Sequence, residues 1–131
     1  MSSTTDRPSG AAQLRRDADT HRVIDGRRWR VSDPALDDTV RQHLVDELMD
    51  ARRAVKAGLA ASDQDATQLA RDRVHAAKVA LGERGPTWWE PMVPDDIDSR
   101  VRAFLRAIGD RLGHLDEDDA RRHLRLDPRV R

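Results

Sequence analysis

The 131-residue chain lacks cysteine and tyrosine, has a single phenylalanine, and contains no long apolar run. Without cysteine it has neither a disulfide framework nor a thiolate ligand for a metal ion. No window approaches the roughly 20 apolar residues that a bilayer-spanning helix needs, and residues 1–10 lack the apolar segment of a signal peptide. We therefore expect a cytoplasmic protein without a membrane span.

Large apolar side chains are scarce, because Leu, Ile, Val and Phe make up about a fifth of the sequence, near the lower limit for a chain that folds alone. The net charge is zero, so the self-repulsion that accompanies disorder is absent. We expect a single, mainly α-helical domain over residues 21–126, flanked by disordered tails at residues 1–20 and 127–131.

The most regular apolar pattern predicts two helices, over residues 34–57 and 63–81. Apolar residues recur at steps of three or four in both segments, which lays one apolar stripe along each helix. If the helices form an antiparallel hairpin with its loop near Ala60, the two stripes meet pairwise. The expected pairs are Val40 with Leu81, Leu44 with Ala77, Leu48 with Val74, Ala51 with Ala70, and Val55 with Ala66.

Local signals set the predicted ends of these two helices. Ser32 or Asp33 would cap the first helix, with Pro34 in its first turn, and Gly58 would end it. Ser62, followed by Asp65 three residues later, resembles a capping box for the second helix, and Gly82 would stop that helix.

Three further elements are expected beside the helical hairpin. The pair Asp25-Gly26 between short alternating runs predicts a β-hairpin over residues 22–31, because a type I′ turn needs positive φ at both central residues. Apolar stripes predict a third, amphipathic helix over residues 96–112 and a short fourth helix over residues 116–125. The third helix carries opposite charges four residues apart, typical of a solvated face, at Asp96 and Arg100, Asp98 and Arg102, and Arg106 and Asp110.

One charged pair follows from the hairpin register, which places Glu47 opposite Arg73. We predict that the two form an ion pair that fixes the register of the helices. The alternative is a charged group left inside a cleft for a ligand.

Two groups of residues are candidates for binding. Arg71, His75 and Lys78 cluster with Val79 on the outward face of the second helix, and Arg84 follows near its end. There His75 could act as a general base, contact a phosphate, or pack against another element. Prolines after residue 85 predict an extended strap in which Trp88 and Trp89 point to opposite sides, so that both complete the core or one meets a partner.

No complete catalytic or metal-binding constellation is present. The five histidines fall on different predicted elements, and neither His-x-x-x-His nor His-Glu-x-x-His occurs. The segment Gly82-Glu-Arg-Gly85 lacks the Lys-Ser/Thr pair of a phosphate-binding loop. We predict no catalytic residue, no cofactor and no metal site.

Several segments together resemble a known group of proteins. They are Trp29-Arg-Val-Ser-Asp-Pro34, Leu44-Val-Asp-Glu-Leu-Met-Asp-Ala-Arg-Arg-Ala-Val55, Arg73-Val-His-Ala-Ala-Lys-Val-Ala-Leu-Gly-Glu-Arg-Gly-Pro86, and Trp88-Trp89. The sequences of these segments are similar to those of small, uncharacterised actinobacterial proteins that often carry the automatic label "biopolymer transporter Tol". The resemblance covers residues 28–90 and implies family membership, but no particular activity, cofactor or site residue.

Three functions remain open from the sequence. The first is a non-catalytic interaction or regulatory protein that binds a protein partner through Trp88, Trp89 and the outer face of the second helix. The second is a nucleic-acid-binding protein with an arginine-rich face made of Arg27, Arg28, Arg30, Arg71, Lys78 and Arg84. The third is a small enzyme that uses His75 with Lys78 or Glu83. Neither the oligomeric state nor the pathway follows from the sequence.

Overall fold

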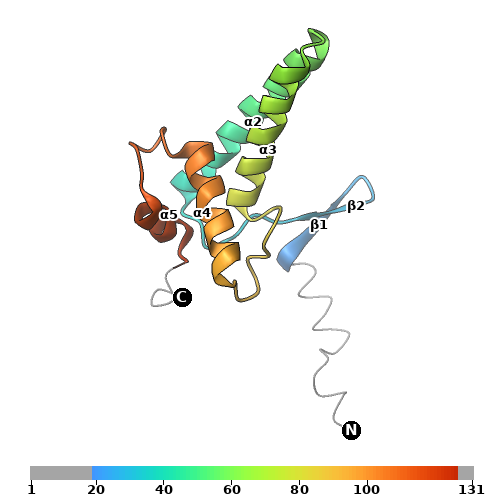
Figure 1. Ribbon diagram of the computed structural model, residues 1–131. Coiled ribbons are helices and arrows are strands. Elements are labelled where there is room, and N and C mark those ends of the chain that lie inside the picture. Colours follow the sequence, from blue (N-terminus) through green and yellow to red (C-terminus); the bar gives the residue numbers. More distant parts are fainter. Residues whose placement is uncertain (1–18, 127–131) are drawn as a thin grey trace. The chain divides into compact units, whose positions relative to one another are not determined.

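The computed structural model describes residues 19–126, and the chain divides into two units, one ending at Ser32 and the other beginning at Asp33. The first unit holds strands β1 (His21–Ile24) and β2 (Arg27–Arg30). The second holds helices α2 (Asp38–Ala60), α3 (Gln64–Leu81), α4 (Pro94–Ile108) and α5 (Glu117–Leu124) (Figure 1). The predicted fold class is therefore confirmed.

The sequence predicts one domain over residues 21–126; in the structure the β-hairpin belongs to the first unit and the helices belong to the second. The hairpin side chains Val23 and Ile24 are 70% and 54% exposed. Of the predicted tails at residues 1–20 and 127–131, residues 1–18 and 127–131 lie outside the described residues. Asp19 and Thr20 are described, and Thr20 is buried at 3% exposure. Among the helices within residues 19–126, none is both long enough and apolar enough to span a bilayer.

Strands β1 and β2 form the predicted antiparallel hairpin. His21 lies opposite Arg30 and Ile24 lies opposite Arg27. The turn residues Asp25 and Gly26 have φ angles of 52° and 79°, as a type I′ turn requires. The Asp-Gly pair in the sequence was therefore sufficient to place the turn.

Helix α2 begins and ends later than predicted. Its N-cap is Asp37 rather than Ser32 or Asp33, and the Asp37 carboxylate accepts a hydrogen bond from the Thr39 N–H at 3.1 Å. Pro34 lies in a turn before the helix. Asp33 is unavailable as a cap because its carboxylate is engaged elsewhere in the core, as described below.

At its other end, α2 continues through Gly58 to Ala60. Gly58 is a point of close approach between helices, since a Cβ atom there would lie 2.4 Å from Thr67 Oγ1 and 2.9 Å from Thr67 N. The glycine therefore lets α3 pack closely and does not terminate α2.

Helix α3 covers nearly the predicted range. Its N-cap is Asp63, whose carboxylate accepts a hydrogen bond from the Ala66 N–H at 3.0 Å, so the prediction of Ser62 as the cap is wrong. Ser62 instead occupies the turn with a φ of 53°. Gly82 ends the helix as predicted, with a φ of 86°, which glycine adopts without a steric penalty.

The predicted stripes form most of the seam between α2 and α3. The buried members of the stripes are Val40, Leu44, Leu48, Ala51, Ala70, Ala77 and Leu81. The last predicted pair fails, because Val55 is only half-buried and Ala66 is exposed. Gly58 and Thr67, which the stripes did not include, are buried there instead.

Helices α4 and α5 complete the main core. Phe104 of α4 is fully buried and stacks on His123 of α5 with ring centroids 5.9 Å apart. The predicted end of α4 at residue 112 is wrong, because turns follow Ile108 and include Gly113 and His114 at positive φ. The cluster comprises Leu36, Val40, Leu44, Leu48, Ala76, Ala77, Ala80, Leu81, Val101, Phe104, Ala107, Ile108, Ala120, Leu124 and Leu126.

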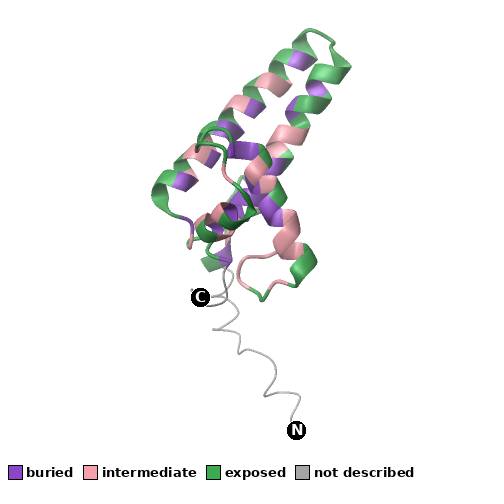
Figure 2. Ribbon diagram, turned by 60° about the vertical axis from the view of Figure 1, so that its left-hand side comes forward, coloured by how far each residue is buried: buried purple, intermediate pink, exposed green. Residues whose placement is uncertain are grey.

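The far end of the α2–α3 hairpin lies beyond this core. The cluster includes α2 residues up to Leu48 and α3 residues from Ala76 onward. We call residues 49–71 the arm. Figure 1 shows the hairpin extending past α4, and Figure 2 shows that the surface of its free end is mostly exposed. The arm is therefore held by a thin seam of small residues.

The core also contains a buried ion pair that the sequence did not reveal. Arg100 of α4 is 0% exposed and Asp33 is 1% exposed, and Arg100 Nη1 lies 2.9 Å from Asp33 Oδ2. The Arg100 Nε and Nη2 atoms donate to the Ala80 carbonyl at 3.3 and 3.1 Å. The Asp33 Oδ1 atom accepts from the Ala35 N–H at 2.9 Å, and the Asp33 N–H donates to the Leu81 carbonyl at 2.8 Å. This network joins the segment before α2, the end of α3, and α4.

The ion pairs predicted along α4 are replaced by pairs between elements. Arg100, which the spacing placed on a solvated face, pairs with Asp33 in the core. Asp98 pairs with Arg121 of α5 at 3.1 Å, and Arg106 lies 3.9 Å from Asp72 of α3. The neighbouring helices offer partners that sequence spacing within α4 does not reveal.

Candidate functional site

The ion pair predicted from the hairpin register is present between α2 and α3. Arg73 Nε and Nη2 donate to Glu47 Oε2 and Oε1 at 2.9 and 3.0 Å. The Glu47 side chain is 8% exposed and that of Arg73 is 41% exposed. The hydrogen bonds to Glu47 raise the pKa of Arg73. The two side chains are therefore positioned as a bidentate pair, which supports the predicted register.

Arg111, which follows α4, extends this pair into a network. Its Nη2 atom lies 3.3 Å from Glu47 Oε1 and donates to Asp50 Oδ2 at 2.9 Å. Hydrogen bonds from Arg111 and then Arg53 lower the pKa of the Asp50 carboxyl. Glu47 thus has two arginine partners, which argues against the alternative of a charge left in a cleft for a ligand.

We predict that Arg73→Ala lowers the free energy of unfolding by about 1–2 kcal/mol, because two charge-assisted hydrogen bonds are lost while solvent screens the half-exposed guanidinium. Arg71→Ala is the matched control, since Arg71 is exposed on the same helix. Urea denaturation of both variants measures the difference. Equal unfolding midpoints for the two would contradict the register of α2 and α3.

The predicted outward face of α3 is partly wrong. His75 is exposed, but Lys78 and Val79 are only 9% and 4% exposed. The chain after α3 turns back over this part of the helix, because a Cβ atom at Gly85 would lie 3.5 Å from Val79 Cγ2. Lys78 is therefore not available as a surface cation.

Arg84, in this returning segment, contacts His75. The Arg84 Nη1 atom lies 3.3 Å from His75 Nδ1, and both side chains are exposed. This places two of the predicted binding residues side by side. It weakens the enzyme hypothesis, because a general base is most effective in a closed, dry site and the imidazole here lies in solvent.

Trp88 and Trp89 do not lie on an extended strap, so that prediction is wrong. The segment bends and turns at the two tryptophans, and their rings meet edge to face with centroids 5.2 Å apart. Both are half-buried. Trp88 packs toward Gly82, since a Cβ atom there would lie 2.9 Å from Trp88 Cδ1. The pair therefore packs against the end of α3 and keeps part of its surface exposed.

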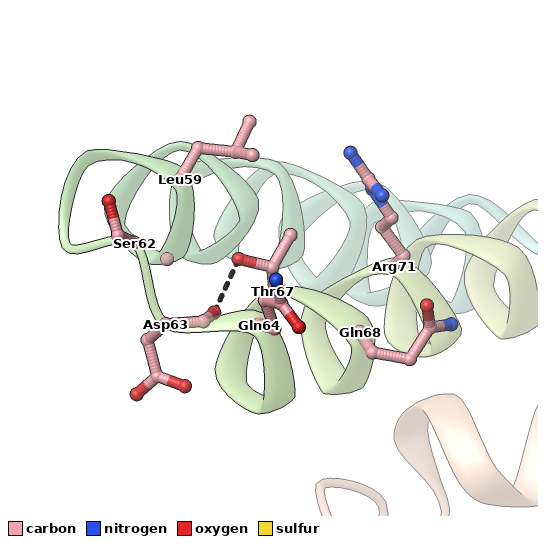
Figure 3. A pocket seen from close by; sticks show the side chains of 8 residues that line it. Leu59, Ser62, Asp63, Gln64, Thr67, Gln68 and Arg71 are labelled. Atoms are coloured by element: carbon pink, nitrogen blue, oxygen red, sulfur yellow. Dashed lines mark hydrogen bonds between the residues drawn. The ribbon is translucent and has the colours of Figure 1, made fainter.

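Arg71 lies at the arm, where α2 and α3 enclose an open hollow of about 500 Å³. The hollow is lined by Gly58, Leu59, Ser62, Asp63, Gln64, Thr67, Gln68 and Arg71. Figure 3 shows the side chains of Leu59 and Arg71 projecting to the same side of the arm, with Thr67 between them. Thr67 Oγ1 donates to the Asp63 carbonyl at 2.7 Å, so the Thr67 hydroxyl that lines the hollow already has a hydrogen-bond partner.

The rim of the hollow combines an apolar and a cationic side chain. Leu59 is 56% exposed. Arg71 is exposed and has neither a hydrogen-bond nor an ion-pair partner among residues 19–126. Helix spacing places the α3 residues Gln64, Gln68, Arg71 and His75 on one face, at steps of four, three and four. We call these four residues, together with Arg84, the α3 ridge.

The α3 ridge contains three of the predicted binding residues, Arg71, His75 and Arg84, and excludes the buried Lys78. Sequence reasoning missed Leu59, Gln64 and Gln68. Leu59 follows Gly58, the predicted end of the helix, so its exposed position beside the hollow could not be predicted. The arginine-rich face of the nucleic-acid hypothesis is not formed as predicted, because Lys78 is buried.

Within residues 19–126 no group of three or more His, Asp or Glu side chains could hold a metal ion. Comparisons of the chain with protein-family models, with curated proteins and with solved structures find no match. The resemblance to the small actinobacterial proteins therefore stays a prediction.

Proposed function

We propose that the chain is a non-catalytic, cytoplasmic interaction or regulatory protein that binds a protein partner along the α3 ridge and Leu59. The observation that supports this proposal is the juxtaposition of exposed Leu59 with Arg71 on the rim of an open hollow. Arginine is one of the residues enriched among those that dominate the energy of protein interfaces, and the exposed Leu59 side chain beside it offers apolar area that binding would remove from water.

The position of the hollow also favours a macromolecular partner. It lies on the arm, outside the main hydrophobic core, and it is bordered by solvent rather than enclosed by the protein (Figure 3). Small-molecule sites, by contrast, bury most of the ligand surface. A partner segment carrying an apolar and an acidic residue would match Leu59 and Arg71.

We test this proposal by affinity capture from a lysate of the organism that encodes the chain, with and without nuclease. Leu59→Ser is expected to lose a protein that the wild type retains after nuclease treatment. Leu69→Ser is the matched control, because Leu69 is 63% exposed but does not line the hollow. Truncating a contact that carries interface energy costs more than about 1 kcal/mol, a loss of more than about fivefold in affinity.

Retention of the same protein by Leu59→Ser and wild type would refute the arm as the binding surface. If both leucine variants fail to capture the protein, general surface apolarity rather than the hollow is responsible for the capture. Trp88→Ala tests whether the exposed part of the tryptophan pair contributes to the same interface.

A further inference from the structure

The β-hairpin of the first unit concentrates basic and aromatic side chains on two short strands. Its eight strand residues include four arginines, Arg22, Arg27, Arg28 and Arg30, and no acidic residue. Arg22, Arg27 and Arg28 are exposed, and Trp29 is 38% exposed. A basic surface of this kind on so small an element is complementary to a polyanion.

The strand register separates these side chains onto two faces. Residues directly opposite each other share a face, and residues two apart on one strand share it also. Arg22 lies opposite Trp29, and Ile24 lies opposite Arg27. We call the face that carries these four residues the Trp29 face. The opposite face carries His21, Val23, Arg28 and Arg30.

The Trp29 ring is held in place on its face. The Arg27 guanidinium carbon lies 4.8 Å from the centroid of the Trp29 ring, within cation–π distance. Arg27 thereby orients the indole, whose remaining exposed surface stands beside Arg22 on the facing strand. A partly exposed indole flanked by cations matches the chemistry of an unpaired base with its flanking phosphates.

We propose that the Trp29 face binds single-stranded nucleic acid, with Arg22 and Arg27 contacting phosphates and Trp29 stacking on a base. Stacking requires a base that is not already paired, which favours a single strand over a duplex. The interaction does not depend on the α3 ridge, so it can hold or fail independently of the proposed protein partner.

The test is fluorescence anisotropy of the full-length chain with a labelled oligothymidylate of about 20 nucleotides, over a range of salt concentrations. We expect binding that weakens as salt rises, with a slope of about 0.7 in the logarithmic plot for each phosphate contacted. Trp29→Ala is expected to lower the affinity about tenfold or more, whereas Trp29→Phe retains a ring and most of the affinity.

Arg22→Glu and Arg28→Glu form a matched pair, because they change the net charge equally on opposite faces of the hairpin. Arg22→Glu is expected to weaken binding much more than Arg28→Glu and to reduce the salt slope. Equal weakening by both would overturn the assignment to the Trp29 face. The proposal is also overturned if no salt-dependent binding is detected, if a duplex of equal length binds more tightly, or if only anionic lipid vesicles bind.

Discussion

Arg100→Ala is expected to lower the free energy of unfolding by about 3–5 kcal/mol, the cost of leaving one member of a buried ion pair without its partner. Asp33 would retain a buried carboxylate facing the space of the lost guanidinium, and the Ala80 carbonyl would lose two hydrogen bonds. For a domain whose total stability is about 5–15 kcal/mol, such a loss removes between about a fifth and all of the stability. Urea denaturation followed by circular dichroism measures it.

Arg102→Ala is the control for this prediction, because Arg102 is exposed on the same helix. It should change the stability by no more than about 0.5 kcal/mol. If Arg100→Ala and Arg102→Ala unfold at the same urea concentration, Arg100 is not buried with Asp33. A large loss for Arg100→Ala also distinguishes the buried pair with Asp33 from the surface pair with Asp96 that sequence spacing predicts, because losing a surface pair would cost little.

Gly58→Val is expected to destabilise the chain by about 1–3 kcal/mol, as overpacking of a tight interface does. The added Cβ atom meets Thr67 backbone atoms, at 2.9 Å from N and 3.0 Å from Cα, so a side-chain rotation cannot relieve the clash. The helices must move apart, which also widens the hollow beside Leu59. Thermal unfolding measures the effect.

The matched control is Ala57→Val, at an exposed position next to Gly58 on the same helix. It introduces the same side chain and should cost only the difference in helix propensity, about 0.5 kcal/mol. A glycine in an exposed helix interior normally makes the helix less stable than another residue such as alanine would. A Gly58→Val variant as stable as wild type would therefore show that α2 and α3 do not approach closely there.

Much of the fold could be predicted because its determinants are local. The Asp25-Gly26 turn, the stripes of α2 and α3, and the stop at Gly82 all depend on residues close in the chain. The Glu47–Arg73 pair could be predicted from the hairpin register, because the matching apolar stripes of the two helices determine that register. These features needed no knowledge of the other helices.

The incorrect predictions share one physical cause. Tertiary contacts compete with the local roles that the sequence suggests for these residues. Asp33 has the chemistry of a helix cap, but the buried guanidinium of Arg100 takes its carboxylate, and Asp37 caps α2 instead. Gly58 has the chemistry of a helix end, but here it serves helix–helix approach. Lys78 has the spacing of a surface residue, but it is buried, and the returning chain packs on the neighbouring Val79. Sequence spacing alone does not show which of these roles prevails.

The candidate site was predicted only in part for the same reason. Arg71, His75 and Arg84 lie on the α3 ridge because helix periodicity placed the first two on one face. The hollow, however, is formed by the α2 end, the turn at Ser62 and the start of α3 together. Its apolar member, Leu59, lies outside the predicted helix, so no sequence pattern connected it with Arg71.

Site-specific photocrosslinking at position 59 tests whether the hollow binds a protein partner. A benzoylphenylalanine residue is placed at position 59 in one variant and at position 69 in another, and each is irradiated in the lysate used for capture. We expect a nuclease-resistant protein adduct from position 59 and none from position 69. An adduct from position 69 alone, or none from either position, would contradict the arm hollow as the surface that binds a protein partner.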